Sequence, residues 1–171
     1  RGALWAERQE GYLLSMEDGL RRVQKIVRQL LEFSQQHDPE LSSTDLNAVV
    51  ERVLVLTNHT FTAHRIRLEK HLSADLPAVM VDRHMIEQVL MNLILNAVQA
   101  IKGGGVIKIR TCVTDERCAI EVEDSGCGIP SHVLPRIFDP FFTTKGIGEG
   151  TGLGLAARLG MEERHGGEML V

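Results

Sequence analysis

The sequence lacks several features on which whole classes of protein depend. Aromatic residues make up only 4% of its 171 residues, so a core must be assembled from Leu, Ile and Val. No apolar run approaches the ~18 residues of a membrane-spanning helix. With a net charge of −4 and a pI near 6.0, the chain also lacks the basic surface of a nucleic-acid-binding domain. We therefore expect a globular protein with no nucleic-acid partner and no membrane contact from this chain.

Paired cysteines and a targeting signal are absent as well. The three cysteines, Cys112, Cys118 and Cys127, are odd in number and have no Cys-x-x-Cys spacing, which indicates reduced thiols and a cytoplasmic location. No signal peptide is recognisable, and the sequence opens at Arg1 instead of a methionine. We expect a piece of a longer protein, whose membrane anchor, if one exists, lies upstream.

A long helix is predicted over residues 6–36. Its apolar residues step by three and four, at Leu13, Met16, Leu20, Val23, Val27 and Leu30. This heptad spacing is typical of a coiled coil, and further apolar positions widen the stripe toward a helical bundle. The alternative is an amphipathic helix folded onto its own domain. A polar linker follows at residues 37–43, so we place a domain boundary between residues 1–38 and residues 39–171.

Residues 39–171 alternate helical and strand-like patterns in a mixed order. Helices are predicted over 44–58 with Thr44 as N-cap, over 83–101 and over 151–165, and strands over 67–72, 78–81, 106–113, 118–123 and from 168 onward. This order favours an α+β fold, an α/β sandwich in which a mixed β-sheet is layered against helices.

The predicted helix 83–101 carries the first chemical signal. It is apolar almost all round, which predicts burial, yet Gln88, Asn92, Asn96 and Gln99 fall within about 80° of arc. A buried amide without a partner costs about 1–3 kcal/mol, so these amides must face something polar. The polar feature is either a structural hydrogen-bond network or a ligand cleft that offers an amide oxygen to a hard cation such as Mg²⁺.

The loop after the predicted strand 118–123 carries the second signal. Asp124 is followed by Gly126 and Gly128, which allow a sharp turn and a close approach of the backbone to a ligand. The Asp124 carboxylate would accept a hydrogen bond from an exocyclic amine, or it would cap the turn.

The third signal is a run of alternate glycines from Gly146 to Gly154. These glycines lead into the predicted helix 151–165, whose free N–H groups would attract phosphate. Phe141 and Phe142 precede the run, which argues against a plain flexible linker.

Together these segments resemble the sequence boxes of sensor histidine kinases. Asn-Leu-Ile-Leu-Asn-Ala at 92–97 is similar to the N box, and Asp-Ser-Gly-Cys-Gly-Ile at 124–129 to the first glycine box. Arg-Ile-Phe-Asp-Pro-Phe-Phe-Thr-Thr-Lys at 136–145 resembles the F box, and Gly-Thr-Gly-Leu-Gly-Leu at 150–155 the second glycine box. The leading helix resembles the second helix of the dimerisation and phosphotransfer bundle. The short segment after Lys145 is similar to that of the nitrogen-regulation type.

The resemblance implies a fold, an activity, cofactors and partners. The fold would be the GHKL ATP-binding sandwich, and the cofactors would be ATP and Mg²⁺. The activity would be that of a protein-histidine kinase, which donates the ATP γ-phosphate to a histidine. The partners would be a second copy, bound through helix 6–36, and a cognate response regulator.

The resemblance also implies roles at matching positions, with Asn96, Arg136 and Lys145 as catalytic residues. Asn96 would ligate Mg²⁺ with Asn92 nearby, and Asp124 would hold the adenine amino group. Lys145 would gather the phosphates, and Arg136 would offset charge that develops on the γ-phosphate. The remaining nucleotide contacts would come from Gly126, Gly128, Ile129, Gly150, Thr151, Gly152, Leu153 and Gly154. Residues 143–150 would form a mobile lid.

One family feature is missing, and other nucleotide motifs fail. None of the seven histidines has the acceptor context, a following acidic residue and then Asn-Pro, so we expect the acceptor upstream of Arg1. Residues 152–157 fit a dinucleotide fingerprint but lack a hydrophobic strand directly before them, and there is no Walker P-loop. An ATP-dependent clamp of the same fold, or a kinase-like domain that only binds partners, stays open as the alternative.

Overall fold

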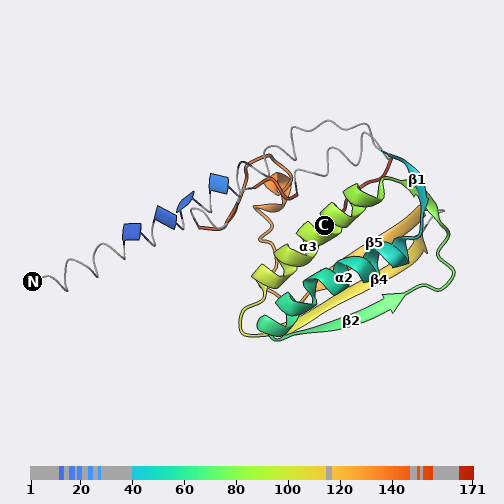
Figure 1. Ribbon diagram of the computed structural model, residues 1–171, viewed down its shortest axis with the longest axis horizontal. Coiled ribbons are helices and arrows are strands. Elements are labelled where there is room, and N and C mark those ends of the chain that lie inside the picture. The colour runs from blue at the N-terminus through green and yellow to red at the C-terminus, as the bar shows by residue number, and fades with distance from the viewer. Residues whose placement is uncertain are drawn as a thin grey trace, which may run out of the picture.

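The structure, a computed structural model, describes residues 12–13, 16–17, 19–20, 23–24, 27, 40–114, 117–146, 150, 152–155 and 166–171. From residue 40 onward its elements are β1 (Ser42–Thr44), α2 (Leu46–Ala63), β2 (Ile66–Leu72), β3 (Val79–Val81), α3 (Arg83–Ala100), β4 (Gly105–Thr114), β5 (Arg117–Asp124) and the 3-10 helix η1 (Leu134–Arg136). The two long helices, α2 and α3, lie side by side over one face of the sheet (Figure 1).

The strands form two small sheets. The larger has the order β2–β4–β5, with β2 parallel to β4 and β4 antiparallel to β5. The smaller pairs β1 with β3 in antiparallel fashion. Because parallel and antiparallel pairs share one sheet and helices cover it, the predicted α+β sandwich with a mixed sheet is confirmed.

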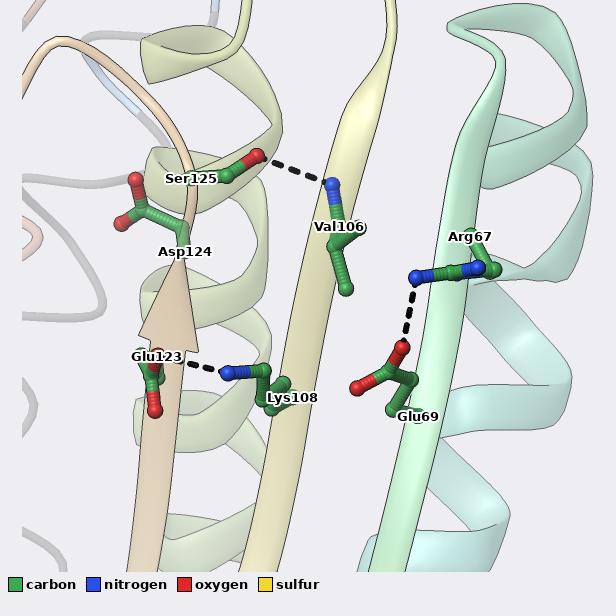
Figure 2. Close-up of a pocket in the computed structure, with 7 residues that line it drawn as sticks. All are labelled: Arg67, Glu69, Val106, Lys108, Glu123, Asp124 and Ser125. Carbon is green, nitrogen blue, oxygen red and sulfur yellow. Dashed lines mark hydrogen bonds and ion pairs between the residues drawn. The ribbon is translucent and has the colours of Figure 1, made fainter.

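Strand alternation gives the larger sheet a helix-covered face and an open face. Ile107 and Ile109 in β4 are fully buried beneath the helices. Lys108 and Arg110 alternate with them and therefore project from the open face. Figure 2 shows Lys108 on this side, with the helices behind the strands.

The core lies between the helices and the covered face. Its main cluster contains one aromatic side chain, as the composition predicts, and otherwise aliphatic ones. The cluster consists of Val50, Val53, Leu54, Phe61, Ile66, Leu90, Ile94, Ala97, Val98, Ile101, Ile107 and Ile109. Burial of each large aliphatic member stabilises the fold by about 1.5–3 kcal/mol, so this cluster fixes how α3 lies on the sheet.

α3 is buried on one side only, so the prediction of burial almost all round is wrong. Its N-cap is Asp82, whose carboxylate accepts the backbone N–H groups of His84 and Met85 at 2.9 and 3.2 Å. Six residues are buried, namely Ile86, Val89, Leu90, Ile94, Ala97 and Val98. Leu95 is 37% exposed, and Gln88 and Gln99 are exposed too. Some apolar residues of α3 therefore lie outside its packed face. The amides lie on the side of the helix that does not face the core.

α2 differs from its predicted bounds at both ends. Thr44 is not the N-cap: it is buried at the end of β1, opposite Val79. Asp45 caps the helix instead, since its carboxylate accepts the Asn47 N–H at 2.8 Å. The helix continues to Ala63 because Phe61 extends the buried stripe by another turn.

Three further predictions are corrected at the borders of the described chain. β1 occupies part of the stretch predicted as the linker 37–43. Residues 168–171 form no strand, and residues 152–155 are not helical. Thr151 and residues 156–165, which make up the rest of the predicted helix 151–165, lie outside the described residues.

The described residues between 12 and 27 are helical, and their apolar stripe is exposed. Leu13, Met16, Leu20 and Val23 are 64%, 67%, 66% and 56% exposed, respectively. Leu30, the last position of the predicted stripe, lies outside the described residues. Over the described part of the chain, no helix has the length and apolar character needed to cross a membrane.

Candidate functional site

Three side chains on the open side of α3 form what we call the amide stripe: Asn92, Asn96 and Gln99. Asn92 and Asn96 are half-buried, and Gln99 is exposed. One turn of helix separates each from the next, so all three face the same region. Gln88, the fourth predicted amide, is exposed near the other end of the helix.

The amide stripe contacts the segment that follows Phe142. The Lys145 ammonium donates hydrogen bonds to Asn96 Oδ1 at 2.9 Å and to Gln99 Oε1. Asn92 Nδ2 donates a longer bond to the Gly154 carbonyl at 3.4 Å. The stripe therefore faces polar groups from 49 to 62 positions further along the chain, as the sequence requires.

The loop after β5 places Asp124 near the end of α3. Asp124 lies opposite the buried Ile107, and cross-strand partners project from the same face, so it belongs to the helix-covered side. Its Oδ1 accepts the Gly126 N–H at 2.8 Å. This is the turn-capping role that the sequence allows, and it engages one of the two carboxylate oxygens.

Gly126 lies too close to α3 to carry a side chain. A methyl carbon there would lie 2.7 Å from the carbonyl carbon and Cβ of Ala100 and from Asp124 Oδ1. The next residue, Cys127, donates its N–H to the Ala100 carbonyl at 3.2 Å. The loop is thus attached to the C-terminal end of α3, at the residue that follows Gln99, the last member of the amide stripe.

The loop and the end of α3 enclose an open hollow of about 260 Å³, lined by Ala100, Ile101, Lys102, Gly104, Ser125, Gly126 and Cys127. Gly128 has a left-handed backbone, with φ of +68°, and has open space around its Cα. Ile129 is 44% exposed beside it. Its lining includes Ser125 and Gly126, which follow Asp124 in the loop, and it lies at the end of α3 just beyond Gln99.

A second hollow, of about 200 Å³, lies at the end of β5 and extends over the open sheet face (Figure 2). Four of its five charged side chains form ion pairs, since Arg67 bonds Glu69 at 2.8 Å and Lys108 bonds Glu123 at 2.9 Å, and the fifth is Asp124. The Lys108 bond and charge, reinforced by Arg110, hold the pKa of Glu123 below its ordinary value of 4.5. Because the charged side chains that project from the open face are paired with one another, that face is the poorer candidate for a ligand site, whereas Asp124 at its edge projects to the helix-covered side.

The glycine run packs against the aromatic segment before it. Phe141 N–H donates to the Gly152 carbonyl at 3.0 Å, and both residues have left-handed backbones, with φ of +67°. A side chain on Gly152 would collide with the Phe141 backbone. Leu153 is buried, and Gly150 lies against Thr143 and Lys145. Thr151 lies outside the described residues.

Arg136 is placed on the exposed side of η1. Its guanidinium carbon lies 4.4 Å from the centre of the Phe142 ring, and its Nε lies 3.7 Å from an Asp139 carboxylate oxygen. Arg136 thus contacts Phe142 and Asp139 of its own segment, and the described residues do not place it on the amide stripe.

The residues present fit a magnesium ion that is held mainly by its substrate. Among the described residues, no group of three or more His, Cys, Asp or Glu side chains could hold a metal ion. Mg²⁺ bound with a nucleotide typically uses one or two protein oxygens, phosphates and waters. Asn96 Oδ1 is suited to such a role, because it already attracts a cation, the Lys145 ammonium.

Sequence reasoning found the stripe, the Asp124 loop and Lys145, but it missed how they connect. The sequence did not predict that Gln99 accepts a hydrogen bond from Lys145, or that Ala100 is the close contact of Gly126. Their positions three and four residues after Asn96 were the available signal, because residues at this spacing share a helix face.

The region from β3 onward matches a known family. Residues 81–171 match the model of histidine kinase-, DNA gyrase B- and HSP90-like ATPases. The chain is 42% identical over 138 residues to the signal transduction histidine-protein kinase AtoS of Escherichia coli K12, covering 80% of this chain and 23% of that protein. It is 39% identical over 150 residues to the sensor histidine kinase ZraS of the same strain, covering 88% and 32%. The chain therefore spans a third or less of the length of these relatives.

Solved structures agree with the sequence relatives. The catalytic domain of histidine kinase ThkA superposes with a TM-score of 0.68 at 35% identity, covering 75% of this chain and 86% of that one. ThkA in complex with response regulator protein TrrA matches with a TM-score of 0.74 at 30% identity, covering 92% and 45%. The family resemblance of the four sequence boxes is thereby confirmed, and the chain belongs to the histidine kinase-, DNA gyrase B- and HSP90-like ATPase family as a catalytic ATPase domain of the sensor histidine kinase kind.

Proposed function

We propose that this chain binds ATP with Mg²⁺ and donates the γ-phosphate to a histidine that lies outside these 171 residues. The observation that carries the proposal is the amide stripe of α3. It places an amide oxygen, a lysine ammonium and a glycine-rich backbone within hydrogen-bond reach of one another, beside the loop that bears Asp124. Phosphoryl transfer depends mainly on positioning and on charge stabilisation, and these groups supply both.

The adenine end of the nucleotide would lie beside Asp124, against the loop that carries Gly126 and Gly128. Asp124 Oδ1 accepts the Gly126 N–H, so its Oδ2 is the oxygen that would accept a hydrogen bond from the adenine amino group. Gly126 lets the loop lie close to α3, and Gly128 and Ile129 leave room for the ring. An ionised carboxylate only accepts hydrogen bonds, so Asp124 would hold the base through an exocyclic amine and not through a carbonyl oxygen.

The phosphates would lie between the amide stripe and the glycine run. Asn96 would offer Oδ1 to Mg²⁺, which when bound neutralises phosphate charge, and Asn92 would hold the run through Gly154. Lys145 and the amides of Gly150, Thr151, Gly152, Leu153 and Gly154 would contact phosphate oxygens. Residues 143–150 would act as the lid. Arg136 would leave Asp139 to reach the charge that develops on the γ-phosphate.

The acceptor and the partners follow from the same assignment. We place residues 1–38 as the second helix of a dimerisation bundle and residues 39–171 as the catalytic domain. The exposed stripe of Leu13, Met16, Leu20 and Val23 supports pairing with a second copy through helix 6–36. The ThkA complex contains a response regulator, and we propose that a cognate regulator also receives the phosphoryl group here, in the cytoplasm.

Calorimetry with ATP tests the binding half of the proposal. We expect binding that requires Mg²⁺ and that Asn96→Ala weakens, whereas Asn58→Ala, an exposed asparagine on α2, leaves it unchanged. Binding with the same affinity in the presence of a metal chelator would contradict the metal assignment. A longer protein that includes the upstream helix tests the transfer half, since acid-labile label from γ-labelled ATP should appear on that helix and not on residues 1–171.

A further inference from the structure

The Lys145 side chain lies across the amide stripe instead of extending into solvent. Its ammonium donates to Asn96 Oδ1 at 2.9 Å and to Gln99 Oε1, and the residue is half-buried. These two acceptors are three residues apart on α3, so a single ammonium reaches both. Lysine has a flexible stem with a compact charge at its end, and two polar acceptors restrict it far more than one.

The backbone around Lys145 supports this placement. Its N–H donates to Thr143 Oγ1 at 3.1 Å. Gly150 returns alongside the lysine stem, since a methyl carbon there would lie 3.2 Å from Lys145 Cβ and Cδ. At the far end of the run, Asn92 holds the Gly154 carbonyl at 3.4 Å. The amide stripe therefore contacts both ends of the segment from Lys145 to Gly154.

The position of the ammonium has a consequence for the metal. Asn96 Oδ1 is the oxygen proposed for Mg²⁺, and the Lys145 ammonium already donates a hydrogen bond to it at 2.9 Å. A divalent ion and an ammonium on the same amide oxygen repel each other strongly where the site is half-buried. The two cations therefore compete for that oxygen, and Lys145 must move when the metal arrives.

From this geometry we infer that Gln99 is a positioning residue, which holds the Lys145 ammonium on Asn96 until Mg²⁺ and ATP displace it. The inference rests on the proposed Mg²⁺ and ATP binding and adds a regulator of it. Gln99 touches neither nucleotide nor metal in this scheme, and it acts only through Lys145. The Gln99 carbonyl raises the Mg²⁺ concentration needed to occupy Asn96 Oδ1, because the Lys145 ammonium must leave that oxygen first.

The Gln99→Met variant tests the inference, because methionine keeps the length of the side chain and its helical preference but accepts hydrogen bonds only weakly. Gln99 is exposed, so the fold should be unaffected, which thermal unfolding would verify. Gln88→Met is the matched control: the same substitution on the same helix, at an exposed position away from Lys145.

The first measurement is made without nucleotide or metal. An N-hydroxysuccinimide ester of acetic acid is used to acetylate lysines, and mass spectrometry compares Lys145 with the exposed Lys102 as internal reference. We expect the relative labelling rate of Lys145 to rise about threefold or more in Gln99→Met and to stay unchanged in Gln88→Met. An unchanged rate in Gln99→Met would overturn the inference.

The second measurement titrates Mg²⁺ at a fixed concentration of ATP and follows nucleotide binding by calorimetry. Release of the lysine should lower the half-saturating Mg²⁺ concentration about threefold in Gln99→Met relative to the wild type and to Gln88→Met. Faster labelling with an unchanged half-saturating concentration would refute competition between the cations. If no variant bound ATP at any Mg²⁺ concentration, the proposed function would fall, while the labelling rates would still report on Gln99 and Lys145.

Discussion

A single methyl group on Gly126 should disable the adenine end of the site. The structure leaves no room for it, because the new carbon would lie 2.7 Å from two atoms of Ala100 and from Asp124 Oδ1. The Ala100 carbonyl carbon belongs to the helix backbone, which cannot rotate away as a side chain could. The loop would have to move off α3, which disturbs the Gly126 N–H bond to Asp124 and the Cys127 N–H bond to Ala100.

The expected size of this effect follows from the same contacts. Overpacking a tight site costs about 1–3 kcal/mol, and the loss of one hydrogen bond costs about 0.5–1.5 kcal/mol. A total of about 1.5–4.5 kcal/mol corresponds to a loss of ATP affinity of roughly 10- to 2,000-fold, if the bound state requires the original loop position. Gly126→Ala should therefore bind ATP at least about 10-fold more weakly.

Gly128→Ala is the control in the same loop. Gly128 has a left-handed backbone, with φ of +68°, but open space around it, so alanine costs only about 1 kcal/mol of backbone strain. Its affinity for ATP should fall about fivefold, measured by calorimetry beside Gly126→Ala. Equal losses in the two variants would refute the reasoning, because strain in the loop, and not its contact with α3, would then govern binding.

Three further predictions concern other parts of the chain. Asp124→Asn should weaken ATP binding about tenfold or more by removing a charged acceptor; unchanged ATP affinity in calorimetry would exclude the adenine contact. Val23→Glu combined with Val27→Glu should reduce self-association measured by sedimentation, and identical masses for both proteins would mean that the stripe does not mediate pairing. Glu123→Gln should remove a pH dependence of the free energy of unfolding. Because the folded-state pKa of Glu123 is lowered, its carboxylate stabilises the fold above pH 4.5, and this stabilisation is lost as the pH falls through the folded-state pKa. The free energies of unfolding of wild type and variant, measured by chemical unfolding, should therefore converge in strong acid.

The elements that periodicity specifies strongly were predicted closely from the sequence. The α3 helix was expected over 83–101 and is found at Arg83–Ala100, because an N-capping aspartate and a glycine run mark its ends. The strands β4 and β5 exceed their predicted ranges by only one residue at each end, since their alternation matches a half-covered sheet.

The predictions fail where contacts with distant parts of the chain decide the local structure. β1 is a short run of Ser, Ser and Thr, and only its pairing with β3 makes it a strand. The burial of α3 was overestimated because apolar residues such as Leu95 remain partly exposed on its open side. The Asp124 loop was predicted from residue types alone, but its attachment to Ala100 depends on where the core holds the end of α3.

Because β4 pairs with β5, the site should be more sensitive to the number of residues in β5 than to side-chain substitutions on the open face of the sheet. Asp124 lies on the helix-covered side because it is opposite Ile107, while Glu123 next to it projects from the open face. Deleting or inserting one residue within β5 would exchange the two faces, so that Glu123 or Ser125 would take the position of Asp124. Single-residue insertions in β5 should therefore abolish nucleotide binding even when every side chain of the site is kept, whereas charge changes on the open face should be tolerated. Among relatives that bind nucleotide, we therefore expect far fewer insertions and deletions in the β4–β5 hairpin than substitutions on its open face.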